Sequence, residues 1–297
     1  MDRREALKRL GAYAAVGALG CSGESAPGDA AALSDTAPGA VAGAAGRQGG
    51  LLDAVGLQLY TIRGEMEGGV EAALERVAAI GYRTVEFAGY FGHSASEIRG
   101  ILERTGLRSP AAHVAPSLEG DAWAAVVEDT LEAGHRYAVL AWIPPDARAT
   151  LDDWRRWADR MNRAGEVARA AGLQFAYHNH DFEFHEVEGE LPFDVIFGRT
   201  DPELVRIELD VYWITHGGGD PVAAFRRWPG RVPMIHVKDR TPTGEMADVG
   251  AGTIDWPTVL REAERAGVRY PFVEHDHPDG PYRSIEASYR YLAAVSL

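Results

Sequence analysis

The most constraining feature of this sequence is a regular alternation that begins at Val55 and continues to the C-terminus. Short runs of apolar and β-branched residues, of the length of buried strands, alternate with stretches whose apolar residues recur at helical spacing. A chain that repeats strand and helix in this way is expected to form a parallel sheet covered by helices. The strand-like runs are Val55–Arg63, Thr84–Gly89, Ser109–Ala115, Tyr137–Ile143, Leu173–His180, Val205–Trp213, Val232–Asp239 and Pro271–Asp276.

Glycines mark the ends of most predicted helices. A glycine just after the last helical residue can adopt the left-handed conformation that returns the chain to a strand. The stretches that a glycine follows are Val70–Ile80, Ala95–Thr105, Asp121–Ala133, Leu151–Ala171 and Trp256–Ala266. Further helices are predicted at Phe193–Arg199, at Pro221–Trp228 and from Arg283 onward.

Eight strand–helix units predict an α/β fold of the closed (β/α)8 type, the TIM barrel. The main alternative is an open doubly wound sheet, which usually has a glycine-rich phosphate loop after its first strand. Here the first strand ends Leu59-Tyr60-Thr61-Ile62-Arg63, without such a loop. An apolar content of 46% is sufficient for one large core. We therefore predict a TIM-barrel domain over residues 51–297.

The N-terminal segment has a different composition. Adjacent Arg3 and Arg4 precede an apolar stretch, Leu10–Gly20, that is too short to span a bilayer as a helix. This arrangement resembles a twin-arginine export signal over residues 1–21. The alternative is an irregular N-terminus that is not cleaved.

The end of this segment, Ala18-Leu19-Gly20-Cys21, resembles a lipobox in which Cys21 becomes the lipidated first residue of the mature protein. Residues 22–50 consist mostly of Ala, Gly, Ser, Pro and Asp and are expected to form a flexible linker. The sequence thus predicts an exported protein, either periplasmic or held at the membrane only through an N-terminal lipid.

Charge and cysteine content exclude several classes of site. The net charge is −14, which argues against nucleic-acid binding because the phosphate backbone requires a basic face. It is equally unsuited to a domain that lies on anionic lipid. Cys21 is the only cysteine, so any metal in the predicted barrel must be held by His, Asp and Glu.

Polar residues gather where a barrel of this type has its active site, at the C-terminal ends of the strands. Four consecutive strand-like runs end in imidazole or carboxylate side chains. Neutral imidazoles and carboxylates suit a borderline or hard divalent ion such as Mn, Co, Zn or Mg. We predict one ion held by His178, Asp210, His236 and Glu274. The alternative is a buried polar cluster or a rim of solvated side chains.

Longer motifs in the same region resemble the sugar phosphate isomerase/epimerase family, the xylose isomerase-like TIM barrels. The matching stretches are Tyr177–Phe184, Ile235–Asp239, Val249–Asp255 and Phe272–Glu274, and the resemblance covers nearly the whole chain after Val55. It implies an enzyme with a Glu/Asp/His/Glu metal site. In such enzymes the ion polarises a sugar carbonyl, so that a side chain can remove the adjacent proton.

Two positions depart from the epimerases of this family. Where they have the first of two metal-bound glutamates, this sequence has His178, which cannot act as a carboxylate base. The next strand often carries Asp-x-x-His in the family, but here it reads Asp210-Val211-Tyr212-Trp213. Both departures favour one base over two-faced epimerisation. The resemblance to exported members therefore predicts a 3-keto-glycoside 1,2-lyase, in which loss of the C2 proton expels the aglycone from C1.

Other functions stay open at this point. They are a keto-sugar epimerase or isomerase, a keto-inositol dehydratase and a non-catalytic sugar-binding lipoprotein; a nuclease conflicts with the acidic charge. The glycine-rich stretch Asp248–Asp255 lacks the Lys-Ser/Thr of a phosphate loop and is expected to be a turn into a helix. We therefore expect an unphosphorylated sugar as substrate. The lyase hypothesis also requires a source of the keto-sugar, such as a partner oxidoreductase.

The resemblance gives Glu274 two roles, metal ligand and base. His180 is the other candidate base, because alternation along a strand puts it on the face of His178. Its alternative role is a supporting hydrogen bond. Lys238 follows His236 by two residues and is expected to stabilise negative charge on a substrate oxygen. A salt bridge to a rim carboxylate is the alternative for Lys238.

Four further side chains are predicted to bind the substrate. Glu86 and His113, near the ends of strands 2 and 3, are expected to hold sugar hydroxyls, although structural hydrogen bonds are an alternative for both. Trp142 and Trp213 close strands 4 and 6, where an indole face can stack on the apolar side of a sugar. Glu183 is expected to be a loop or supporting residue.

Overall fold

The computed structural model describes residues 50–114 and 117–297. The predicted export signal (1–21) with its Cys21, and the predicted linker (22–50) apart from its last residue, lie outside the described residues. Among the described residues, no helix has both the length and the apolar character needed to cross a membrane.

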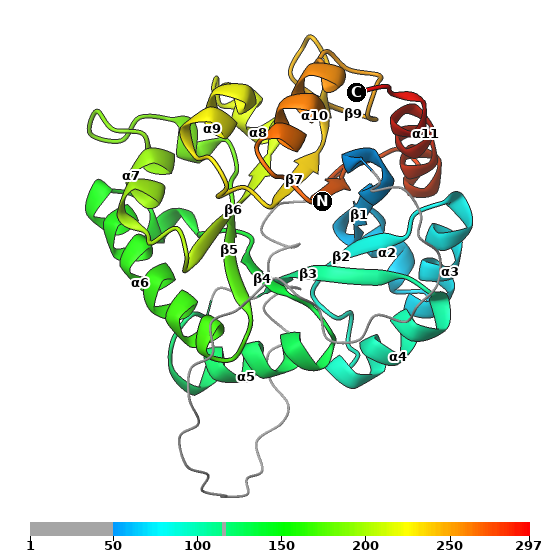
Figure 1. The fold of residues 1–297 in the computed structure, drawn as a ribbon, viewed down its shortest axis with the longest axis horizontal. Coiled ribbons are helices and arrows are strands. Elements are labelled where there is room, and N and C mark those ends of the chain that lie inside the picture. Colours follow the sequence, from blue (N-terminus) through cyan, green and yellow to red (C-terminus); the bar gives the residue numbers. More distant parts are fainter. Residues whose placement is uncertain (1–49, 115–116) are drawn as a thin grey trace, which may run out of the picture. The chain divides into compact units, whose positions relative to one another are not determined.

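Eight parallel strands close into a barrel in the order β1-β10-β7-β6-β5-β4-β3-β2 (Figure 1). This confirms the predicted TIM barrel. The barrel strands are β1 (Gly56–Gln58), β2 (Thr84–Ala88), β3 (Arg108–Val114), β4 (Tyr137–Leu140), β5 (Gln174–His178), β6 (Val205–Asp210), β7 (Met234–Val237) and β10 (Tyr270–Val273).

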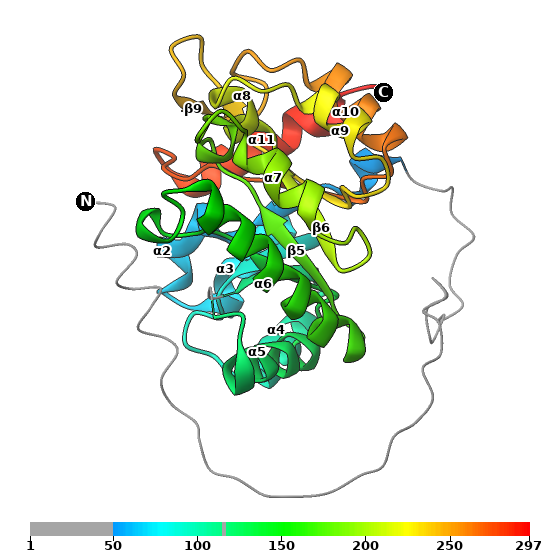
Figure 2. The ribbon, with the colours of Figure 1, turned by 90° about the vertical axis from the view of Figure 1, so that its left-hand side faces the viewer.

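Helices cover the outside of the barrel; Figure 2 shows α6 lying along β5. The α-helices are α2 (Arg63–Met66), α3 (Val70–Ile80), α4 (Ala95–Thr105), α5 (Gly120–Glu132), α6 (Leu151–Ala170), α7 (Pro192–Arg199), α8 (Val211–His216), α9 (Pro221–Arg227), α10 (Trp256–Arg265) and α11 (Pro281–Ala294). Short 3-10 turns, η2 to η5, lie at Leu51–Ala54, Leu59–Ile62, Pro145–Ala147 and Phe182–Phe184.

The long helices agree closely with the predicted ranges because local signals set their ends. Ser94 and Glu97 form a capping box at the start of α4, which ends at Gly106 in the left-handed conformation. Thr150 and Asp153 form a second box at the start of α6. Each box satisfies backbone N–H groups that the first turn of a helix leaves unpaired.

The strands are shorter than predicted because side chains at the C-terminal rim turn the chain. Strand β1 ends at Gln58, because the side chain of Gln58 accepts a hydrogen bond from the backbone N of Tyr60 at 3.0 Å and turns the chain. Asp210 ends β6, and its Oδ1 accepts from the backbone N of Trp213 at 2.8 Å. Residues predicted as strand in these two places are therefore a 3-10 turn with α2 and the helix α8.

A second difference follows β7. Asp239–Arg240 (β8) does not continue the barrel strand but pairs antiparallel with Met246–Ala247 (β9). The Asp239 carboxylate accepts hydrogen bonds from the backbone N of Gly250, at 2.9 Å, and from Nε1 of Trp256, at 2.9 Å. The glycine-rich stretch thus wraps around one buried carboxylate and leads into α10, in agreement with its predicted role as a turn.

The barrel interior beneath the rim is apolar. A compact cluster of Ala111, Val139, Ala176, Met234 and Phe272 is almost completely buried there, together with Tyr137. Several of these side chains lie two residues before a predicted site residue and therefore on the same face of the strand. They form an apolar layer inside the barrel, and the polar side chains of the site lie above this layer.

Candidate active site

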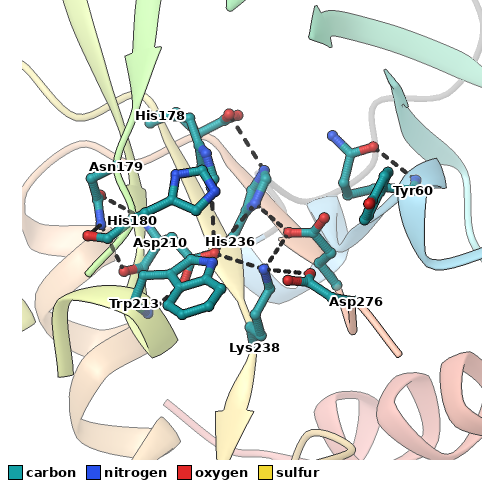
Figure 3. A network of polar contacts seen from close by, with 12 residues as sticks. Tyr60, His178, Asn179, His180, Asp210, Trp213, His236, Lys238 and Asp276 are labelled. Atoms are coloured by element: carbon teal, nitrogen blue, oxygen red, sulfur yellow. Dashed lines mark hydrogen bonds and ion pairs between the residues drawn. The ribbon is translucent and has the colours of Figure 1, made fainter. Parts of the chain in front are cut away.

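The structure brings the four predicted metal ligands together at the ends of β5, β6, β7 and β10 (Figure 3). Their ligand atoms all lie within 4.8 Å of one another, and all four side chains are buried. Nε2 of His178 lies 3.4 Å from Oδ2 of Asp210, and Nδ1 of His236 lies 2.8 Å from Oε2 of Glu274. We refer to His178, Asp210, His236 and Glu274 as the ligand cluster.

The ligand cluster fits a divalent ion. It offers two imidazole nitrogens and two carboxylate oxygens, a donor set suited to Mn, Co or Zn. Nδ1 of His236 and Oε2 of Glu274 are buried without a well-formed hydrogen bond among the described residues, although they face each other. Buried polar atoms of this kind usually have a partner, and a cation between them would supply it.

Lys238 places an ammonium group against the ligand cluster. Its Nζ lies 2.8 Å from Oε2 of Glu274, 3.1 Å from Oδ2 of Asp210 and 2.8 Å from Oδ1 of Asp276. Burial alone would lower the pKa of Lys238, but these three carboxylates raise it well above its ordinary value. Lys238 therefore carries a positive charge and forms the ion pairs expected as its alternative role; stabilisation of a substrate oxygen stays a prediction.

His180 lies just beyond the end of β5, with its ring centroid 4.9 Å from that of His178. The ring stacks on Phe182 at 5.2 Å, and its buried Nδ1 has no hydrogen-bond partner among the described residues. Burial, with the neighbouring His178 and Lys238, lowers the pKa of His180 well below its ordinary value. Burial thus favours the neutral imidazole, and the unpartnered Nδ1 is the ring atom of His180 that a substrate could meet.

Glu183 holds the segment that carries His180. Its buried carboxylate accepts hydrogen bonds from the hydroxyl of Tyr177 and, at 2.8 Å, from the backbone N of His180. Burial raises the pKa of Glu183 to about 7. The sequence indicated only a loop or supporting role, and the contact with the backbone of His180 shows what it supports.

A second polar group, Glu86, His113 and Glu208, lies against the other nitrogen of His236. Oε2 of Glu86 is 2.8 Å from Nε2 of His236, and Nε2 of His113 is 2.8 Å from Oε2 of Glu208. Gln58 donates to the same oxygen of Glu86 at 2.7 Å. Glu86 is fully buried and lies beneath His236, with its Oε2 held by these contacts and its Oε1 without a hydrogen-bond partner among the described residues. Its predicted contact with sugar hydroxyls stays a prediction.

Burial raises the pKa of Glu86 well above its ordinary value, and the nearby Glu208 adds to this effect. Burial would also raise the pKa of Glu208, but His236 and His113 lower it well below the ordinary value. Sequence analysis missed Glu208 and Gln58. The signal for Glu208 was available, because it lies two residues before Asp210 and alternation puts both on one face of β6.

The two predicted tryptophans are in different surroundings. Trp213 lies in the first turn of α8 and not at the end of a strand, and only 7% of it is exposed. The rings of Tyr212 and His180 lie 4.8 and 5.4 Å from its own ring, so Trp213 is almost completely enclosed by its neighbours, and its stacking on a sugar stays a prediction. Its Nε1, however, has no partner among the described residues. Trp142 follows β4 and is half-buried, so its stacking role stays a prediction.

A closed eight-stranded barrel with a His/Asp/Glu cluster at the C-terminal ends of its strands defines a metalloenzyme-like TIM barrel. Residues 74–294 match the sequence profile described as "Xylose isomerase-like TIM barrel", and the chain belongs to this family. The fold and family predicted from the sequence motifs are therefore confirmed.

Two relatives and one distant structure show where the chain stands within the family. An inosose dehydratase of Geobacillus kaustophilus is 25% identical over 57% of this chain and 61% of its own length. The crystal structure of a sugar phosphate isomerase/epimerase from Parabacteroides distasonis is 28% identical, with a TM-score of 0.73 over 81% of this chain and 98% of that one. A 3-keto-D-glucoside 4-epimerase from E. coli shares the fold, with 14% identity and a TM-score of 0.60 over 82% and 99% of the two chains.

The matched part spans less than two thirds of the inosose dehydratase sequence. These relatives are named for enzymatic activities on sugar-like compounds, in agreement with the prediction that this chain is an enzyme.

Proposed function

We propose that this protein is a divalent-metal-dependent enzyme that removes the proton next to the carbonyl of a keto-sugar, and more specifically a 3-keto-glycoside 1,2-lyase. The observation that carries the proposal is that His180 and Lys238 both lie against one ligand cluster: the ring of His180 is 4.9 Å from that of His178, and Nζ of Lys238 is 2.8 Å from Oε2 of Glu274. The first is suited to accept a proton and the second to stabilise the negative charge that this transfer creates.

In this proposal a divalent ion held by His178, Asp210, His236 and Glu274 would polarise the ketone and acidify the adjacent C–H. His180 takes the proton from C2, and the electron pair of that bond forms the C1–C2 double bond. The C1–O bond breaks, and the aglycone leaves with a proton taken from water or from the protonated His180. Lys238 stabilises the charge that develops on the ketone oxygen.

The surroundings of Glu274 favour elimination over epimerisation. An epimerase needs two groups that exchange roles as base and acid on opposite faces of the sugar. Oε2 of Glu274, the carboxylate candidate, is shared between His236 and Lys238 at 2.8 Å each. His180 is the less encumbered base, because its Nδ1 has no partner within the described residues.

A second candidate is a keto-inositol dehydratase. The similarity to the inosose dehydratase of G. kaustophilus favours it. Its first step would be the same proton removal by His180, followed by loss of a hydroxyl group in place of an aglycone. The two candidates therefore differ in the leaving group and in the ring, and a comparison of substrates separates them.

The test uses the full-length protein loaded with Mn or Co, with a 3-keto-glucoside followed by NMR in D2O. Release of the aglycone together with an unsaturated keto-sugar is the expected result. Deuterium at C2 with an inverted centre and an intact glycosidic bond would show an epimerase. Turnover of an inosose alone would favour the dehydratase.

The variant His178→Ala separates an enzyme from a sugar-binding protein. Loss of turnover with sugar binding retained supports catalysis. Unchanged sugar capture, with no turnover of any keto-sugar by the unaltered protein, would support the binding protein. A partner oxidoreductase that produces the keto-sugar is part of the lyase proposal, since the proposed substrate is already oxidised at C3.

We further propose that the protein is exported and anchored through Cys21, on the sequence pattern of residues 1–21. Cell fractionation tests this. The unaltered protein is expected in the membrane fraction after export, and Cys21→Ala is expected to lose the lipid and to leave that fraction. Equal distribution of both proteins would contradict the anchor.

A further inference from the structure

His236 lies at the centre of the site with both ring nitrogens engaged. It is fully buried. Its Nδ1 faces the ligand cluster, 2.8 Å from Oε2 of Glu274 and 3.6 Å from Oδ2 of Asp210. Its Nε2 faces the opposite way, 2.8 Å from Oε2 of Glu86 and 3.4 Å from Oε2 of Glu208.

A neutral imidazole carries one proton on one of its two nitrogens. For Nδ1 to offer its lone pair to an ion, Nε2 must carry that proton and donate it to an acceptor. The nearest acceptor is Oε2 of Glu86. A carboxylate in this position fixes both the orientation of the ring and the nitrogen that faces the ion.

We propose that Glu86 is a positioning residue that holds His236 with Nδ1 turned toward the ligand cluster. This inference rests on the proposed metal-dependent function. Glu86 was expected to touch the substrate; its burial and contacts assign it to the side of His236 that faces away from the ion. It acts on the ion only through His236.

Glu86 is itself held by its neighbour in the barrel. Gln58 of β1 stands beside Glu86 of β2 in the strand register. The Gln58 side chain accepts from the backbone N of Tyr60 at 3.0 Å and donates to Oε2 of Glu86 at 2.7 Å, which fixes the orientation of its amide. A continuous row of contacts thus leads from the turn after β1 to a metal ligand on β7.

The same geometry raises a rival explanation. Glu86, His113, Glu208 and His236 each offer one atom within 4.8 Å of the others, so this group has the composition of a second metal site. Oε2 of Glu86, however, already accepts from Gln58 and lies 2.8 Å from Nε2 of His236, and Nε2 of His113 lies 2.8 Å from Oε2 of Glu208. Protons held in these contacts account for the two Oε2 atoms, whereas Oε1 of Glu86 and Oε1 of Glu208 have no partner among the described residues. The count of ions per chain separates the two explanations.

The test compares Glu86→Leu with Glu86→Gln in the full-length protein. Leu removes the acceptor, and Gln keeps an amide oxygen that can accept from Nε2 of His236. We expect Glu86→Leu to weaken Mn or Zn affinity about 10- to 100-fold, with one ion per chain at saturation, and Glu86→Gln to recover part of the loss. Glu262→Gln, on the outer helix α10 where Glu262 contacts Arg226 at 3.2 Å, is the control for a Glu-to-Gln change and should keep the affinity of the unaltered protein.

A second measurement does not depend on the ion. In the metal-free protein, NMR of the imidazole nitrogens should show a slowly exchanging proton on Nε2 of His236, which Glu86→Leu removes. Circular dichroism and the unfolding temperature show whether each variant is folded.

Several outcomes would overturn the inference. Unchanged affinity and an unchanged Nε2 proton in a folded Glu86→Leu protein would show that Glu86 does not position His236. Two ions per chain, with one lost in Glu86→Leu, would make Glu86 a ligand. If no ion binds the unaltered protein while the Nε2 proton depends on Glu86, the positioning stands and the proposed metal-dependent function fails. If Glu86→Leu does not fold, the same comparison with Glu86→Gln decides, with a smaller expected effect.

Discussion

The two halves of the barrel use the same architecture for different purposes. Strands β5, β6, β7 and β10 end in the ligand cluster, whose atoms include a buried nitrogen and oxygen without well-formed hydrogen bonds among the described residues. Strands β1 to β3 carry Gln58, Glu86 and His113, whose contacts run to one another, to Glu208 and to His236. The second half carries the proposed ligand atoms, and the first half contacts the opposite side of His236, where Oε1 of Glu86 is also without a partner among the described residues.

The comparison teaches that polarity in a barrel interior does not identify a reacting group. Glu86 and Asp210 are both fully buried carboxylates that contact His236, and what distinguishes them is the nitrogen each one faces. The expected consequence is that changes in the second half abolish chemistry, whereas changes in the first half weaken binding or positioning.

The largest effect is expected for Asp210→Asn. The amide oxygen can still accept from the backbone N of Trp213, but the variant loses the charge that faces Lys238 and the ion. We expect turnover to fall by about 10³-fold with loss of bound metal. Metal analysis and steady-state kinetics measure both. Glu208→Gln, two residues earlier on the same strand, should lose less; an equal loss would remove the distinction between the two sides of His236.

A smaller loss with a different signature is expected for His180→Gln. If His180 is the base, turnover should fall by about 10²-fold while the metal content stays that of the unaltered protein. His178→Gln should lose the metal as well. These two histidines are neighbours in space, so the contrast tests their separate roles directly. Full activity in His180→Gln would transfer the role of base to Glu274.

Glu183, whose carboxylate holds the backbone of His180, is expected to make the free energy of unfolding depend on pH. Glu183 has an ordinary pKa near 4.5 and a folded-state pKa of about 7, so the folded protein binds its proton more tightly than the unfolded chain. Its contribution is greatest below pH 4.5 and is lost as the pH rises to about 7, a change of about 3 kcal/mol in the free energy of unfolding.

Glu183→Gln keeps an acceptor for the backbone N of His180 and cannot ionise. Urea unfolding at pH 5 and pH 8 should therefore show a smaller pH-dependent loss in this variant than in the unaltered protein. Identical pH profiles would show that Glu183 does not titrate in this range.

The smallest effect is expected in the first half, at Trp142→Ala. Stacking of an indole on a sugar contributes about 1 kcal/mol, so KM should rise roughly fivefold while kcat and metal content change little. Trp228→Ala, at a tryptophan after α9, is a control for general loss of an indole. A large fall in kcat for Trp142→Ala would show that a residue of the first half takes part in the reaction itself, which would contradict the comparison.

The sequence by itself determined the helices and the ligand cluster. Helix ends depend on neighbouring residues, such as the capping pair Ser94 and Glu97, so a local pattern is sufficient to place them. The ligands could be predicted because closure of a barrel brings the ends of all its strands to one rim, whatever the length of chain between them.

Only the tertiary structure decided which partner each polar side chain meets. Alternation along a strand shows which face a residue occupies, but its depth and contacts depend on how neighbouring strands are staggered when the barrel closes. Glu86 therefore meets His236, 150 residues away in sequence, a contact that its position on the strand could not indicate. Trp213 lies in a helix because Asp210 caps a turn there, a competition between strand and helix that the apolar run Val205–Trp213 could not reveal.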